Sequence, residues 1–98
     1  MTIDSIDLQL SAQKALFGRV TPNLRRVYIA SDKTKILMTF YYDGEVSDDT
    51  RDLAKCAAAE VIADFPDYQI ETRIMRLDEP DRIPATKGYC IYARYEPL

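Results

Sequence analysis

The segment from Ser47 to Pro66 constrains the fold most, because it carries the signals for both ends of one helix. The hydroxyl of Ser47 is a favoured N-cap, and the two aspartates that follow place negative charge at the positive end of the helix dipole. Apolar residues then recur at helical spacing in two adjacent rows, Leu53, Ala57 and Val61 and Ala54, Ala58 and Ile62. Pro66 ends the pattern. We predict a helix from Ser47 to about Asp64 whose alanine-rich face lies close against a sheet.

Segments with the composition of β-strands lie on both sides of this helix. Arg25–Ser31 and Thr34–Tyr42 are rich in β-branched and aromatic residues and are joined by a short polar turn, which predicts a hairpin. The second strand turns an all-apolar row to one side, namely Ile36, Met38, Phe40 and Tyr42. Tyr68–Leu77 and Tyr89–Tyr95 alternate in the same way and predict two further strands. The 11-residue connection Asp78–Gly88 has no strand pattern, so something other than secondary structure must order it.

A first helix is expected from about Ser5 to Phe17. Asp4 or Ser5 can cap its start, and Gly18 can take the left-handed conformation that often follows a helix. Its apolar residues form two neighbouring rows, Ile6, Leu10 and Phe17 and Leu8, Ala12, Ala15 and Leu16. We expect both rows to be buried.

The predicted element order over residues 1–98 is α-β-β-α-β-β, in a single α+β domain. A four-stranded, largely antiparallel sheet with both helices packed on one face covers every apolar row described above. The other face of the sheet then carries a mixture of charged and apolar side chains: Lys35, Leu37, Tyr41, Glu71, Arg73, Met75, Tyr92 and Arg94. Such a mixed surface suits an interface.

The absence of histidine excludes several classes of active site. A Ser-His-Asp or Cys-His nucleophile system requires an imidazole, as do many zinc sites. The 16 acidic residues against 13 Lys and Arg give a net charge of −3, which argues against a nucleic-acid partner. The three glycines are scattered, so no phosphate-binding loop is recognised, and we expect no cofactor and no metal.

The N-terminus and the cysteines indicate a cytoplasmic protein. Met1–Asp7 contains two aspartates and no basic residue, unlike the start of a signal peptide. No apolar stretch is long enough to span a bilayer, so no membrane partner is expected. Cys56 and Cys90 lack the spacing of a metal site, and we expect both to be reduced and buried.

Carboxylates cluster in the connections and at the start of the second helix. Together with one tyrosine they form the partner-binding surface predicted from the sequence: Tyr41, Asp43, Glu45, Asp48, Asp49, Asp52, Asp78, Glu79 and Asp81. Such a surface attracts a partner with a basic surface and presents the same charge as a phosphate backbone. We assign no catalytic residue, because carboxylates in turns and first helical turns are expected to be solvated.

Five segments carry a family resemblance: Ser11–Gly18, Tyr42–Ser47, Glu60–Pro66, Arg76–Pro80 and Tyr92–Arg94. From Ser11 to Tyr95 the chain resembles small acidic bacterial immunity proteins of contact-dependent growth inhibition and related polymorphic toxin systems. The resemblance implies a cytoplasmic α+β protein that binds and neutralises a cognate toxin, often a nuclease, and is not an enzyme. The shared segments are caps, turns and a proline stop, so the resemblance assigns no binding residue.

Two other functions fit the sequence. The exposed sheet face, with Leu37, Tyr41, Met75 and Tyr92, can bury itself in a homodimer, which makes the chain a self-associating structural module. Alternatively, the carboxylate clusters can serve a small enzyme that uses metal-assisted or acid–base hydrolysis.

Overall fold

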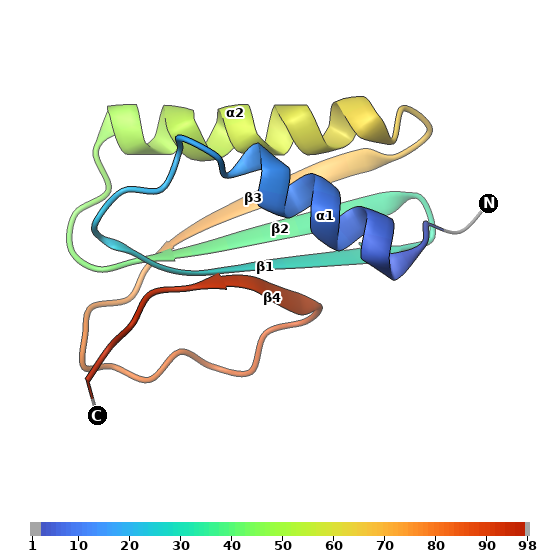
Figure 1. Ribbon diagram of the computed structural model, residues 1–98. Coiled ribbons are helices and arrows are strands. Elements are labelled where there is room, and N and C mark those ends of the chain that lie inside the picture. The colour runs from blue at the N-terminus through green and yellow to red at the C-terminus, as the bar shows by residue number, and fades with distance from the viewer. Residues whose placement is uncertain (1–2, 98) are drawn as a thin grey trace.

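The computed structural model describes residues 3–97 of the chain. Its elements follow the predicted order: α1 (Ser5–Ala15), β1 (Leu24–Asp32), β2 (Lys35–Tyr42), α2 (Asp48–Asp64), β3 (Gln69–Arg76) and β4 (Tyr89–Ala93). Both helices lie on one face of a four-stranded sheet, and the connection between β3 and β4 runs on the side away from them (Figure 1). The α+β architecture predicted from the sequence is confirmed.

The sheet has the strand order β3-β2-β1-β4 and is mostly antiparallel. The strand β1 pairs in the antiparallel sense with β2 on one side and with β4 on the other. The strand β3 runs parallel to β2, in register from Lys35–Gln69 to Tyr42–Arg76. This parallel pair follows from α2, because a helix that crosses over one face returns the chain to the start of the neighbouring strand.

Side-chain caps define the starts of both helices, as the sequence predicted. The backbone N–H of Ile6 donates to Asp4 Oδ1 over 2.8 Å at the start of α1. The backbone N–H of Thr50 donates to Ser47 Oγ over 3.1 Å at the start of α2. These bonds satisfy amides that would otherwise lack a partner in the first helical turn.

The core lies between the sheet and the two helices. Its largest fully buried side chains are Tyr42, Phe40, Leu8, Leu24, Ile29, Ile36, Met38, Val27 and Val61. The predicted apolar row of β2 is confirmed, since all four of its residues belong to this core. Burial raises the pKa of the Tyr42 phenol to about 12, because the charged phenolate would lose its hydration there.

The expectation that both apolar rows of α1 are buried is wrong. Leu8, Ala12 and Ala15 point into the core, whereas Ile6, Leu10 and Phe17 are 63%, 58% and 88% exposed. The two rows lie on different sides of the helix, so only one can face the sheet. The buried row faces both the sheet and α2: Leu8 and Leu16 fill the core, and Ala12 and Ala15 allow α1 to approach α2 closely.

The second sheet face is less apolar than expected. A bulge between Val27 and Tyr28 of β1 shifts the register of β4, so that Tyr92 pairs with Val27 and packs on the helix side. Tyr41 stays on the predicted face but is only 7% exposed, because its hydroxyl is hydrogen-bonded to Thr86 Oγ1 at 2.8 Å. Tyr92 was therefore placed on the wrong face, and the β3–β4 connection covers Tyr41.

Both cysteines are also placed differently from the expectation. Cys56 on α2 and Cys90 on β4 are exposed free thiols, not buried side chains. Between residues 3 and 97, neither helix combines the length and the apolar composition needed to cross a membrane.

Candidate functional site

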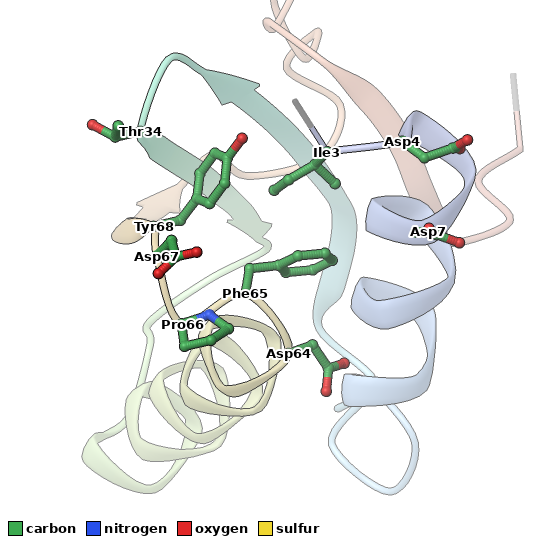
Figure 2. A pocket seen from close by; sticks show the side chains of 9 residues that line it. All are labelled: Ile3, Asp4, Asp7, Thr34, Asp64, Phe65, Pro66, Asp67 and Tyr68. Carbon is green, nitrogen blue, oxygen red and sulfur yellow. The ribbon is translucent and has the colours of Figure 1, made fainter. Parts of the chain in front are cut away.

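A pocket of about 350 Å³ opens between the start of α1 and the turn that joins α2 to β3 (Figure 2). Its lining residues come from four parts of the chain: Ile3, Asp4, Asp7, Thr34, Asp64, Phe65, Pro66, Asp67 and Tyr68. Four of these nine residues are aspartates, and we call this feature the acidic pocket. It combines a concave surface, apolar side chains and a concentration of carboxylates, which makes it the candidate site.

The turn after α2 builds one wall of the acidic pocket. Pro66 prevents the helix from continuing, and Phe65 leaves the helical conformation with φ −133° and ψ 69°. The backbone N–H of Tyr68 then donates to the Phe65 carbonyl over 2.9 Å, which closes the turn. The next amide, that of Gln69, donates to the Thr34 carbonyl and starts β3 beside the hairpin. The segment Phe65–Tyr68 is thereby held beside the hairpin, and it lines the pocket together with the first turn of α1.

Aromatic and aliphatic side chains line the inside of the acidic pocket. The rings of Phe65 and Tyr68 meet edge to face, with centroids 6.5 Å apart and planes at 72°. In Figure 2 the Phe65 ring lies in the middle of the group, with Tyr68 and Asp67 on one side and Asp7 on the other. An apolar floor with carboxylates around it suits a ligand that has an apolar stem and a positively charged end.

The carboxylates of the acidic pocket are only partly used within the protein. Asp64 Oδ2 accepts a hydrogen bond from Ser11 Oγ at 2.7 Å and lies 3.8 Å from Lys14 Nζ. Asp7 and Asp67 make no ion pair with any residue between 3 and 97. Among those same residues, no three acidic or thiol side chains converge closely enough to hold a metal ion.

An apolar ridge adjoins the acidic pocket along α1. A shallow groove lined by Asp7, Leu10, Ser11, Lys14, Asp64 and Phe65 continues from the pocket and shares three residues with it. Leu10 is one member of the exposed row Ile6, Leu10 and Phe17, which we call the α1 ridge; Phe17 lies in the turn directly after the helix. Large apolar side chains this exposed along one helix and the turn after it are typical of an interaction surface.

The structure brings together one part of the acidic surface predicted from the sequence. Asp78 Oδ1 accepts from the backbone N–H of Gly44 at 2.6 Å, and Asp43 Oδ1 accepts from that of Glu79 at 3.3 Å. The two connections that contain these acids therefore lie side by side. These three acids are already engaged in ion pairs with arginines, however. Asp78 is paired with Arg76, and Asp43 and Glu79 are both paired with Arg94. The Arg76 guanidinium, with help from the Gly44 amide, lowers the pKa of Asp78 below its ordinary value.

The remaining predicted acids are available to a partner. Glu45, Asp48, Asp49, Asp52 and Asp81 are exposed and form no ion pair with any residue of the described range 3–97. The three aspartates stand on the first turn and a half of α2, at the opposite end of that helix from the acidic pocket. A rise of 1.5 Å per residue puts Asp48 about 24 Å from Asp64 along the helix axis.

The MafI2 immunity protein family matches residues 5–96 of the chain. The chain belongs to the MafI2 immunity protein family. The match confirms the resemblance to immunity proteins of polymorphic toxin systems that the sequence motifs indicated. A comparison with curated proteins found no match.

Arg25, Arg94 and Glu96 of this MafI2 family member form an arginine clasp that no pattern in the sequence predicts. Arg25 is only 4% exposed and holds Glu96 with two bonds of 2.8 Å, from Nε to Oε2 and from Nη2 to Oε1. Its Nη1 donates to the carbonyl oxygens of Leu77 and Asp81, so it fixes the start of the β3–β4 connection. Arg94 Nη2 reaches the same Glu96 carboxylate at 3.0 Å. The two arginines lower the pKa of Glu96 to about 2.

The clasp depends on a bulge that sequence spacing does not reveal. Leu24 pairs with Tyr42 and Arg26 with Tyr41, so Arg25 is the extra residue of β1 at this point. A bulge redirects a side chain relative to the alternation of the strand, and here it turns Arg25 toward the β3–β4 connection. The clasp confirms that this connection is ordered by contacts other than secondary structure.

Proposed function

We propose that this immunity protein neutralises its cognate toxin by covering the toxin's active site, and that the toxin is a nuclease with a basic surface. The family match over residues 5–96 carries the proposal, because it spans nearly all of the described chain. The protein acts in this proposal as an inhibitor with no reaction of its own.

The exposed acids support a nuclease as the target. A nuclease binds the phosphate backbone of its substrate through lysine and arginine side chains, which attract an acidic protein surface equally well. The net charge of −3 favours fast association with such a partner.

The residues of the contact surface predicted from the sequence differ in whether they are free to bind a partner. Glu45, Asp48, Asp49, Asp52 and Asp81 supply unpaired carboxylates, whereas Asp43, Asp78 and Glu79 already hold arginines and Tyr41 is covered. A toxin contact at the start of α2 therefore needs no internal ion pair to break. We propose this end of α2 as part of the interface.

Co-expression tests the proposed function. The protein encoded next to the immunity gene is produced alone and with the immunity protein, and cell growth and the integrity of cellular nucleic acid are measured. We expect nucleic-acid degradation by the neighbour alone, protection by the immunity protein, and a stable complex on size exclusion. A neighbour that leaves nucleic acid intact contradicts the nuclease assignment, and protection without a complex contradicts direct occlusion.

Substitutions test the proposed contact at α2. Asp49→Asn combined with Asp52→Asn is expected to slow association with the toxin and to reduce its salt dependence. The control is Asp32→Asn combined with Glu71→Gln, which removes the same number of charges on the opposite side of the sheet, where Asp32 pairs with Lys87 and Glu71 with Lys35 and Arg73. Equal association rates for both double variants contradict a contact at this end of the helix.

A further inference from the structure

We propose that the acidic pocket receives one lysine or arginine side chain of the cognate toxin, and that the α1 ridge packs against apolar toxin surface beside it. This inference rests on the proposed function and adds to it a second contact, at the other end of α2. The pocket and the ridge act together in this proposal, as a charged anchor site with an apolar border.

The dimensions and lining of the pocket fit such a side chain. A volume of about 350 Å³ lies at the lower end of the range for ligand-binding pockets. The methylene stem of lysine or arginine can lie on Phe65 and Ile3, and its cationic end can reach the carboxylates at the rim. A cation beside an aromatic face is also attracted by the ring itself.

Charge selects a cationic partner. Asp4, Asp7, Asp64 and Asp67 line the pocket, and Lys14, whose ammonium group lies 3.8 Å from Asp64, is an exposed side chain. Asp7 and Asp67 are not engaged by another described side chain in an ion pair, so binding a guanidinium there breaks no such pair. A second copy of this chain would bring the same four carboxylates and the same net negative charge, which opposes self-association through this surface.

The proposed contact extends beyond the pocket because the α1 ridge exposes apolar surface directly beside it. Ile6, Leu10 and Phe17 leave large apolar surface in water, and the groove from Asp7 to Leu10 joins that surface to the pocket. Interfaces commonly place an arginine or aromatic anchor in a pocket and surround it with contacts that exclude water. Water exclusion by the ridge strengthens the attraction between the toxin cation and the aspartates, because the effective dielectric constant falls.

Two groups of variants test the proposal, with the complete immunity protein and the cognate toxin. Asp7→Asn combined with Asp67→Asn removes charge from the pocket, and Leu10→Ser combined with Phe17→Ser removes two of the three apolar side chains of the ridge. The control is again Asp32→Asn combined with Glu71→Gln. Thermal unfolding verifies that every variant is folded, and titration calorimetry measures the dissociation constant at two salt concentrations.

We expect the pocket variant to bind the toxin at least about tenfold more weakly and with a smaller salt dependence, and the ridge variant to bind about tenfold more weakly with an unchanged salt dependence. Single substitutions of the toxin's surface lysines and arginines should then identify one cation whose removal costs wild-type binding but not binding by the pocket variant. Wild-type affinity in the folded pocket variant overturns this inference and leaves the proposed function intact. A wild-type protein that does not bind the toxin overturns both.

Discussion

Replacement of Glu96 by glutamine should remove one of the strongest single contributions to the stability of this protein. The Glu96 carboxylate accepts two hydrogen bonds from Arg25 and one from Arg94, and its side chain is 20% exposed. Glu96→Gln keeps the size of the side chain and removes its charge. The nearly buried guanidinium of Arg25 would then lose the carboxylate with which it pairs.

The expected magnitude follows from the pKa of Glu96. Arg25, with help from Arg94, lowers this pKa from 4.5 to about 2. Because one pKa unit corresponds to 1.36 kcal/mol, the charged carboxylate stabilises the folded state by about 3 kcal/mol at neutral pH. Removal of one partner from a buried ion pair typically costs about 3–5 kcal/mol, which agrees with this value.

The sign of the pH dependence is fixed by the direction of the shift. A carboxyl whose pKa is lower in the folded state contributes its full stabilisation above the pKa of the unfolded chain, near 4.5. That contribution is lost as the pH falls from there toward about 2. The stability difference between the wild type and Glu96→Gln should therefore be about 3 kcal/mol at pH 7 and below about 1 kcal/mol at pH 2.

Urea unfolding followed by tyrosine fluorescence measures this difference, since the chain has seven tyrosines and no tryptophan. The control is Glu79→Gln, the same chemical change at a carboxylate that pairs with Arg94 but is 35% exposed, for which we expect a cost below about 1 kcal/mol. Equal costs for the two variants at pH 7, or a cost of Glu96→Gln that does not change with pH, would refute the reasoning.

Four further substitutions test other features of the fold by thermal or urea unfolding. Gly88→Ala should destabilise by about 2 kcal/mol or more, because φ is +102° and the new Cβ would lie 2.7 Å from that of Ala30, whereas Gly44→Ala has open space and should cost about 1 kcal/mol. Ser47→Ala removes the cap of α2 and should cost about 1 kcal/mol; a cost no larger than that of an exposed mid-helix substitution would argue against the cap. Tyr41→Phe removes the hydrogen bond to Thr86 and should cost about 1 kcal/mol, and an unchanged midpoint would show that this bond does not hold the connection.

Local signals in the sequence predicted the elements of the fold well. The caps at Asp4 and Ser47 and the proline after α2 set the helix ends, since each acts on the backbone within a few residues. The alternation in β2 identified the buried face of the sheet, because one side of that strand is apolar throughout. Both kinds of signal are short-range, and the structure confirms them.

Tertiary contacts determine the features that these local signals did not predict, namely the buried face of α1, the arginine clasp and the acidic pocket. Both rows of α1 are apolar, and the packing against the sheet and α2 decides that the row of Leu8, Ala12 and Ala15 is the buried one. The bulge at Arg25 and the pairing of this residue with Glu96, 71 positions away, follow no periodicity. The acidic pocket joins Asp4 and Asp7 to Asp64 and Asp67 across some sixty residues of sequence. The site was missed for the same reason as the clasp.

The strand order implies that β4 can separate from β1 at a lower free-energy cost than β2 can. The strand β1 is joined to β2 by a tight turn, whereas its other neighbour, β4, is reached only after α2, β3 and the clasped connection. We therefore expect the pairing of β4 and the bonds of Arg25 and Arg94 to form and break together, as one cooperative unit at the edge of the sheet. In native-state hydrogen exchange, amides of β1 bonded to β4 should exchange earlier than those bonded to β2, while the amides of the two helices stay protected.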